Sequence, residues 1–235
     1  MLEYRFDVNV TENDFYDDGS VKLSSLLFFF QEAATEHANE IGIGRDALLE
    51  KNLVWILAKM KVRILKDVEM GDGYYVMTYP RAVKSRFCPR DYYLYDKDDQ
   101  LVAVGSGIWS LMDWTTRKVV RATEIDFGGE FREDEAFPEG FEKIRIKNAV
   151  EVKEYTVTAD DIDENEHTNN CRYADMINMA TDISPVREFV IQFSKETREG
   201  EVIILAAEDD EDGQLIGGTL HDGQAVFSAK VTNRK

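Results

Sequence analysis

One short segment holds most of the side chains that could do acid–base chemistry. Residues 161–170 read Asp-Ile-Asp-Glu-Asn-Glu-His-Thr-Asn-Asn and come directly before a stretch with helical spacing. A His with neighbouring carboxylates can carry or orient a proton near neutral pH. The free N–H groups of a helix N-terminus, together with an Asn amide, can stabilise an oxyanion that develops on a carbonyl. Asp163, Asn165 and His167 therefore favour chemistry at a carbonyl carbon.

The same segment has the beginning of a calcium-binding loop. Asp161, Asp163 and Asn165 stand at positions 1, 3 and 5 of the EF-hand spacing. Position 6 is Glu166 where the turn needs Gly, and position 12 is Arg172 where a bidentate Glu belongs. We therefore expect no metal and no cofactor here.

Two other interpretations of this segment stay open. Cys171 lies four residues after His167 and near a helix N-terminus, which lowers the pKa of a thiol, so it is a candidate nucleophile. Helical spacing opposes that role, because a helix that buries Tyr173 and Ile177 turns Cys171 away and leaves it an inert cysteine. Alternatively, the Asp, Asn and Thr side chains only cap the helix and turn the chain.

The chain contains two copies of one unit. An acidic loop that opens a helix begins at Thr11 and again at Thr158, an offset of 147 residues. Lys66-Asp67 recurs as Lys195-Glu196 at an offset of 129, so the second copy is 18 residues shorter, and the difference falls on residues 41–55. Such self-similarity indicates two structural units of the same kind.

The catalytic candidates occur in the second copy only. The positions of the first copy that match Asp163, Asn165 and His167 hold other side chains, namely Tyr16, Asp18 and Ser20. A loop of this kind therefore opens a helix without the Asp, Asn and His set. We place any chemistry in the second copy.

Each copy predicts the order strand, helix and then several strands. Apolar residues at the 3-to-4 spacing of one buried helical face run from Leu23 to Ile41, and a second helix is expected at about residues 170–183. Runs rich in β-branched and aromatic residues predict the strands. Strands are expected at residues 4–10, 54–65, 73–80, 91–95 and 101–114, then at 150–157, 188–194, 201–208, 214–220 and 224–232.

These elements predict an α+β fold with two domains. Residues 1–120 form the first domain and residues 150–235 the second. Residues 121–149 carry Gly128-Gly129, Pro138 and many acids, which is typical of a linker. One helix followed by several antiparallel strands, twice over, predicts that each sheet buries a single helix.

Composition excludes several classes of protein. The 235 residues are 43% hydrophobic with 15 Gly and 4 Pro, which excludes a disordered or collagen-like chain. The sequence has no run of about 18 apolar residues, so we expect no membrane span. Two cysteines and the absence of a signal-peptide pattern predict a cytoplasmic protein or a mature chain. The 46 acidic and 28 basic residues give a net charge of −18, which repels nucleic acid and anionic lipid.

Residues 161–173 resemble the D-x-N-x-H-x-N-N-x-x-Y signature of acyl-acyl-carrier-protein thioesterases. The resemblance covers nearly the whole chain and includes residues 23–34, the strand with Trp55, Arg90-Asp91 and residues 109–117. It implies a tandem hot-dog fold, in which each antiparallel sheet wraps around one long helix. The implied activity is hydrolysis of fatty acyl-carrier-protein thioesters to free fatty acid, which ends fatty acid synthesis.

The functional residues of that family match four positions of this chain. Its loop residues match Asp163, Asn165 and His167, and its carboxylate on the following strand matches Glu196. Plant members often have a Cys just after that Glu, whereas this chain has Thr197. The difference excludes a Cys nucleophile at that place and favours attack by water with the help of a carboxylate.

We hypothesise a role for each of these side chains in thioester hydrolysis. Glu196 would act as general base on water, and His167 would orient that water or pass a proton to the leaving thiolate. Asn165 and the N–H groups near Asn169-Asn170 would polarise the carbonyl. Asp163 would hold the loop and its His or Asn in place. The division of roles between Glu196 and His167 stays open.

The resemblance also implies an acyl pocket between the helix and the sheet of the first copy. The candidate lining residues are Phe28, Phe30, Trp55, Met60 and Met112. The carrier protein is acidic, so an enzyme of net charge −18 needs a basic patch to bind it. One candidate patch is a loop with Arg81, Lys84, Arg86 and Arg90, and the other is a strand face with Lys59, Lys61 and Arg63.

Two alternative functions and the oligomeric state stay open. The same chemistry on coenzyme A thioesters would use the same residues. A non-catalytic acyl-binding module is disfavoured, because binding alone needs no base beside a polarised carbonyl. Single hot-dog units usually pair, so the tandem chain is either a monomer that satisfies this pairing internally or a homodimer.

Overall fold

In both copies a strand leads into a helix and then into further strands. The computed structural model describes residues 2–123 and 125–233. The first copy contains β1 (Tyr4–Val10), α1 (Leu23–Glu40), α2 (Arg45–Leu49), β2 (Leu53–Ile64), β3 (Gly71–Pro80), β4 (Cys88–Tyr95), β5 (Leu101–Asp113) and β6 (Val119–Val120). The second contains β7 (Val150–Thr156), α3 (Arg172–Ala180), β8 (Glu188–Phe193), β9 (Val202–Asp210), β10 (Gly213–Leu220) and β11 (Ala225–Thr232).

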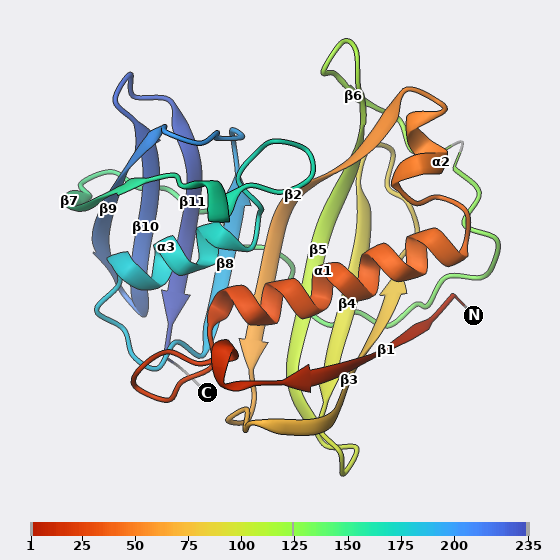
Figure 1. Cartoon of the computed structure of the whole chain (residues 1–235), viewed down its shortest axis with the longest axis horizontal. Coiled ribbons are helices and arrows are strands. Elements are labelled where there is room, and N and C mark those ends of the chain that lie inside the picture. The colour runs from red at the N-terminus through yellow and green to blue at the C-terminus, as the bar shows by residue number, and fades with distance from the viewer. Residues whose placement is uncertain (1, 124, 234–235) are drawn as a thin grey trace.

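The strands form one antiparallel sheet (Figure 1). Their order is β1-β3-β4-β5-β2-β8-β11-β10-β9-β7, with β6 paired to β5. Counted inward from the two outer edges, the strands read β1-β3-β4-β5-β2 in the first copy and β7-β9-β10-β11-β8 in the second. Both are the order first, third, fourth, fifth, second, so the two copies have the same topology. They join where β2 pairs with β8, from Lys59 opposite Gln192 to Arg63 opposite Glu188. The predicted repeat is confirmed, and its two units share a continuous sheet.

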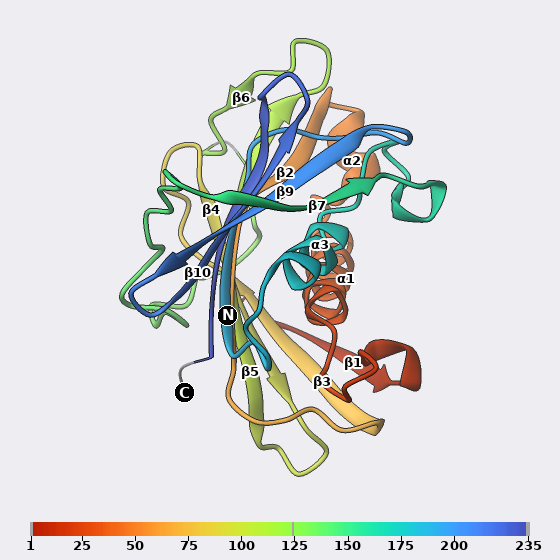
Figure 2. The same ribbon diagram turned by 90° about the vertical axis from the view of Figure 1, so that its left-hand side faces the viewer.

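Helices α1 and α3 pack against the same face of this sheet (Figures 1 and 2). The apolar side of α1 is buried as its spacing predicts. Phe30 is 1% exposed, and its ring stacks on that of Tyr92 from β4 with centroids 5.0 Å apart. Gly105 of β5 permits this contact, because a Cβ there would lie 2.6 Å from Phe30 Cε2. Burial of such a ring stabilises the fold by roughly 1.5–3 kcal/mol.

The second helix ends three residues before the predicted position. Thr181 leaves the helical conformation, and its hydroxyl donates to Gln214 Oε1 at 2.7 Å. The Asp182 N–H donates to the same oxygen at 2.9 Å. These two hydrogen bonds hold residues 181 and 182 against β10. The Asp182 N–H, which a longer helix would pair with a helix carbonyl, is satisfied by Gln214 instead. Within residues 2–123 and 125–233, no helix is long and apolar enough to cross a membrane.

The extra residues of the first copy contain α2 and lie against the end of α1. Gly42 has φ +73°, a left-handed conformation that ends α1 at little cost. The Trp55 indole N–H donates to the Ile43 carbonyl at 2.9 Å and so holds the connection against β2. This connection carries Arg45, whose side chain reaches the second copy.

The described residues between β6 and β7 form neither helix nor strand. The first part packs on the helix side, where the ring centroids of Phe127 and Trp55 are 6.4 Å apart, and the later part runs along the other face of the sheet (Figure 2). The Phe137 ring covers Lys61 Nζ, 4.7 Å from the centroid, and Glu139 binds the ammonium at 3.1 Å. Lys61 is only 1% exposed, and Arg63 binds the same Glu139 at 2.9 Å. The prediction of a basic docking face at Lys59, Lys61 and Arg63 is wrong, because Glu139 and Phe137 of this segment pair with and cover two of its three cations, Lys61 and Arg63.

Candidate active site

The loop before α3 is held in place by Asp161. The carboxylate of this residue accepts hydrogen bonds from the Thr158 N–H at 2.8 Å, the Thr158 hydroxyl at 3.0 Å and the Tyr155 hydroxyl at 2.8 Å. Thr11 and Asp14 form the same capping box in the first copy. The cap therefore uses none of the Asp, Asn and His side chains farther along the loop, and they are available for another role.

A tight hairpin presents Asp163, Asn165 and His167. The Asp163 N–H donates to the His167 carbonyl at 2.9 Å, and the Glu166 N–H donates to the Asp163 carbonyl at 3.0 Å. Glu166 has φ +62°, a left-handed conformation that few side chains adopt. The Asp163 carboxylate accepts from the Asn165 N–H at 2.8 Å and from the Asn165 amide at 3.4 Å. Asp163 thus holds Asn165 at the tip of the loop.

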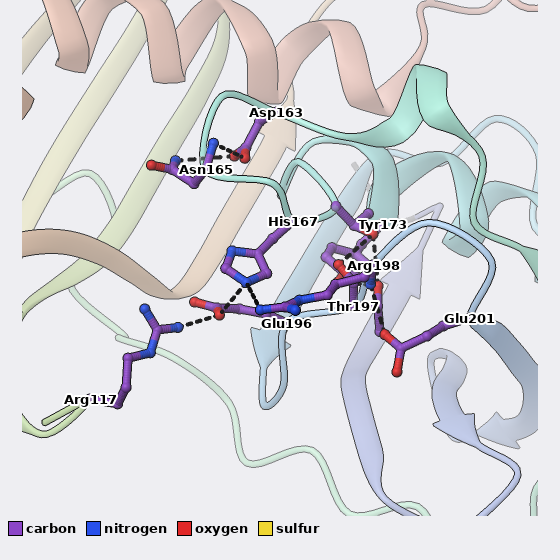
Figure 3. A network of polar contacts seen from close by, with 10 residues as sticks. Arg117, Asp163, Asn165, His167, Tyr173, Glu196, Thr197, Arg198 and Glu201 are labelled. Atoms are coloured by element: carbon purple, nitrogen blue, oxygen red, sulfur yellow. Dashed lines mark hydrogen bonds and ion pairs between the residues drawn. The ribbon is translucent and has the colours of Figure 1, made fainter. Parts of the chain in front are cut away.

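Thr197 ties this hairpin to the segment that carries Glu196. The Thr168 N–H donates to the Thr197 carbonyl at 2.8 Å. The hydroxyls of Thr168 and Tyr173 lie 2.8 and 2.9 Å from the buried Thr197 hydroxyl. Since Glu196 directly precedes Thr197, its carboxylate is placed beside His167, and Glu196 Oε2 and His167 Nε2 are 3.3 Å apart (Figure 3).

Two arginines contact this pair (Figure 3). Arg117, from the turn between β5 and β6, binds Glu196 Oε2, so the first copy contributes to the site. Arg198 Nη2 lies 3.5 Å from His167 Nε2. The side chain of Glu196 is 44% exposed and that of His167 is 14% exposed, so the carboxylate is open to water. Spacing along the chain could not identify Arg117 as its partner, because 79 residues separate it from Glu196.

A cavity of about 470 Å³ opens beside the hairpin. Its volume is in the range of small-molecule sites. Its lining comes from α1, β2, β4 and β5, from Pro80 at the end of β3, from the connection at residues 43–45, from Phe127 of the segment between the copies, and from the loop before α3 of the second copy. The apolar part includes Phe28, Ile43, Trp55 and Trp109. At the loop end the lining is polar and includes Asp163, Asn165, Asn169 and Asn170.

Family models match both copies of the repeat. The model of the acyl-acyl-carrier-protein (acyl-ACP) thioesterase N-terminal domain matches residues 1–126, and that of the C-terminal domain matches residues 144–231. The chain belongs to the acyl-ACP thioesterase family. The predicted resemblance is confirmed.

The curated relatives of this chain include plant proteins. An acyl-ACP hydrolase of Cuphea viscosissima, described as chloroplastic, is 22% identical over 190 residues. A palmitoyl-acyl carrier protein thioesterase of Arabidopsis thaliana, also chloroplastic, is 25% identical over 188 residues. Each match covers 73% of this chain and 45% of the relative, so the chain spans about half the length of the curated relatives it matches.

Solved structures confirm the expected tandem hot-dog fold. An acyl-ACP thioesterase from Bacteroides thetaiotaomicron superposes with a TM-score of 0.85 at 21% identity, covering 98% of this chain and 97% of the other. The 12:0-ACP thioesterase from Umbellularia californica gives a TM-score of 0.78 at 18% identity, covering 99% and 97%. The α+β class and the pairing of one main helix with each half of the sheet agree with the prediction.

The acyl-ACP thioesterase cavity contains some of the predicted lining residues and not others. Phe28 and Trp55 line it, whereas Phe30 packs on Tyr92 and Met60 is buried in the main core. Met112 neighbours Leu111 on β5, which packs in the core beside the cavity, so Met112 faces the opposite side of the sheet. The predictions for Phe30, Met60 and Met112 are wrong, because Phe30 and Met60 pack together beside Gly105 in the core, outside the cavity lining, and Met112 lies on the other side of the sheet.

Cys171 lacks the environment of a nucleophilic thiol. It is buried, and burial raises the pKa of its thiol far above the neutral range. Its Sγ donates to Gln31 Oε1 at 3.7 Å, on the α1 side of the loop. The structure therefore favours the inert cysteine over the nucleophile. Among the side chains that the structure describes, no group of three or more His, Cys, Asp and Glu could hold a metal ion.

The predicted docking loop is divided between surface and interior. Lys84 and Arg86 are exposed in the turn before β4. Arg90 is 6% exposed, because β4 begins at Cys88, three residues before the predicted start, and places Arg90 between β3 and β5. The prediction that Arg90 contacts a carrier protein is therefore wrong.

Proposed function

We propose that this chain hydrolyses fatty acyl-ACP thioesters to free fatty acid and thereby ends fatty acid synthesis. The observation that carries the proposal is the meeting of Glu196 and His167, 3.3 Å apart, next to a hairpin that lines a cavity with apolar walls. A base, a polarising loop and an apolar cavity are the three parts that hydrolysis of a fatty thioester needs.

In the proposed reaction Glu196 activates a water molecule. Its carboxylate takes a proton while the water oxygen attacks the thioester carbon. Collapse of the tetrahedral intermediate breaks the C–S bond, and His167 orients the water or passes a proton to the departing thiolate. Arg117 binds one oxygen of Glu196, which leaves the other free to accept the proton.

The hairpin supplies the groups that polarise the carbonyl. Asn165 Nδ2 carries two hydrogens, and the Asp163 carboxylate accepts from it at 3.4 Å, so a second hydrogen is available for an oxyanion. Arg45 Nε donates to Asn165 Oδ1 at 3.3 Å and fixes the amide from its other end. The Asn169 N–H already donates to the Asp161 carbonyl at 2.8 Å, and the Cys171 N–H donates to Asn169 Oδ1 at 2.9 Å. Of the predicted N–H groups we therefore retain that of Asn170, at the start of α3, where the helix dipole favours negative charge.

The acidic carrier protein is the proposed partner. Lys84 and Arg86 are exposed, as a docking patch requires, and we retain them as its candidates. We also propose the predicted division of labour: residues 1–120 supply the acyl pocket, residues 121–149 connect, and residues 150–235 carry the catalytic groups. Both cysteines are free, which fits the proposed cytoplasmic location. We propose that the tandem chain satisfies hot-dog pairing internally as a monomer, with a homodimer as the alternative that sedimentation would reveal.

Thiol release from medium- and long-chain acyl-ACP and from the matching acyl-CoA tests the function. We expect the wild-type protein to cleave acyl-ACP and Glu196→Gln to lose a factor of about 100 or more in kcat/KM. Glu199→Gln is the matched control, because Glu199 is an exposed carboxylate three residues away. Equal rates on acyl-CoA would contradict the carrier assignment, and cleavage of neither substrate would leave an acyl-binding module.

A further inference from the structure

A second arginine lies beside the pair formed by His167 and Glu196. Arg198 Nη2 is 3.5 Å from His167 Nε2 (Figure 3). In the chain, the buried Thr197 separates Arg198 from Glu196, and the residues on both sides of Thr197 are exposed. The Arg198 guanidinium therefore lies on the water side of the site and contacts the ring that transfers a proton in the proposed reaction.

No carboxylate neutralises Arg198 in the part of the chain that the structure describes. Its backbone N–H donates to Glu201 Oε2 at 2.7 Å, but its guanidinium forms no ion pair with that carboxylate. His167 is the one hydrogen-bond partner of the guanidinium among the described residues. Arg117, by contrast, is paired with Glu196. The positive charge of Arg198 is therefore available to a further anion.

The sulfur of the thioester lies on the same side of the site as Arg198. Asn165 and Asn170 line the cavity that takes the acyl chain, whereas His167, Glu196 and Arg198 do not line it. The acyl chain therefore extends from the carbonyl into the cavity, and the sulfur extends toward the open side. Transfer of a proton from His167 to the thiolate, one of its two roles in the proposed reaction, brings the sulfur within hydrogen-bond reach of the ring. Arg198 Nη2, in contact with the same ring, is then close enough to interact with a charged sulfur.

We propose that Arg198 stabilises the thiolate that leaves when the C–S bond breaks, and is thus a further catalytic residue. In this step the electron pair of the C–S bond passes to sulfur, and the negative charge stays there until a proton arrives from His167. A guanidinium beside the sulfur lowers the energy of this charged stage. The guanidinium keeps its own charge throughout, because arginine does not lose its proton in proteins. The inference rests on the proposed function, since it assigns one step of that reaction.

The dependence of the rate on the leaving thiol tests this role. The probes are two dodecanoyl thioesters, one of N-acetylcysteamine, an alkyl thiol, and one of thiophenol, an aryl thiol and a stronger acid. A more acidic thiol leaves more readily and needs less stabilisation. We expect Arg198→Gln to lower kcat about 10- to 100-fold on the alkyl thioester and less than about threefold on the aryl thioester. Neither probe contains the carrier protein, so docking does not affect the comparison.

Two further variants assign the effect to the charge at this position. Arg198→Lys keeps the positive charge and should recover most of the rate on the alkyl thioester. Lys195→Gln removes a cation one residue before Glu196 and should change the rates on both thioesters by the same factor. The Arg198 side chain is exposed, so Arg198→Gln should keep the free energy of unfolding within about 0.5 kcal/mol of wild type.

The outcomes separate this role from the proposed hydrolysis. Equal losses of Arg198→Gln on the two thioesters would overturn the proposal. A loss on acyl-ACP alone, through KM, would also overturn it and would make Arg198 a contact of the carrier protein. Both results leave the hydrolase proposal standing. If wild-type protein cleaves neither thioester nor acyl-ACP, the hydrolase proposal is wrong and the role of Arg198 is wrong with it.

Discussion

Thr197→Val tests how the fold holds the general base in place. Valine keeps the shape of threonine but removes the hydroxyl that contacts the hydroxyls of Thr168 and Tyr173 at 2.8 and 2.9 Å. The Thr168 hydroxyl keeps its bond to the Thr197 carbonyl at 3.2 Å, whereas the Tyr173 hydroxyl, on a residue 2% exposed, loses its bond to the Thr197 hydroxyl. An unsatisfied buried hydroxyl costs about 1–3 kcal/mol and the second lost bond about 1 kcal/mol. We therefore expect the free energy of unfolding to fall by about 2–4 kcal/mol.

Urea unfolding followed by tryptophan fluorescence measures this loss, and Tm should fall by about 4–16 °C. Because Glu196 directly precedes Thr197, kcat should also fall at temperatures where the variant is fully folded. Thr197→Ser keeps the hydroxyl and should retain most of the stability. Thr115→Val is the control, since the Thr115 hydroxyl is exposed and its loss should cost less than about 0.5 kcal/mol. A Thr197→Val variant within about 0.5 kcal/mol of wild type would refute the reasoning.

Three other perturbations test separate parts of the molecule. Arg117→Gln should lower kcat about 10- to 100-fold, because Arg117 positions Glu196. KM should change little, because Arg117 lies outside the cavity lining. An unchanged pH profile of kcat would contradict this positioning role. Lys84→Glu with Arg86→Glu should raise KM for acyl-ACP and weaken its salt dependence, and equal kinetics would remove this patch as the docking site. Burial, with the nearby guanidinium of Arg90, lowers the pKa of His37 to about 4 in the folded state, against about 6.5 when unfolded. Between about pH 4 and pH 6.5 the unfolded state therefore binds more protons than the folded state. The free energy of unfolding should then fall by about 1.4 kcal/mol for each pH unit below pH ~6.5. Urea titrations at pH 7 and pH 5 should show this part of the slope in wild type and not in His37→Gln.

Local patterns predicted the elements and the repeat. Helical spacing located α1, because one side of that helix meets the sheet along its whole length. The comparison of the two copies identified the loop at Asp163, Asn165 and His167. Both copies form the capping box with a Thr and an Asp, so these three side chains are not needed to open the helix. The end of α3 was misplaced, because Gln214, far along the chain, binds the residues that follow the helix.

The sequence by itself determined the α+β class, the tandem organisation and the segment that carries the catalytic candidates, because these depend on periodicity and on residues close together in the chain. Tertiary structure alone decided which side chains meet. Arg117 reaches Glu196 across the boundary between the two copies, and Phe137 covers Lys61 from the connecting segment. Tertiary structure also places Arg90 in the cavity lining, where the sequence predicted a surface contact. The register between β3, β4 and β5 sets the face of the sheet on which each side chain lies. These contacts join residues far apart in the sequence. They form only when the strands associate, so the spacing of neighbouring residues does not predict them.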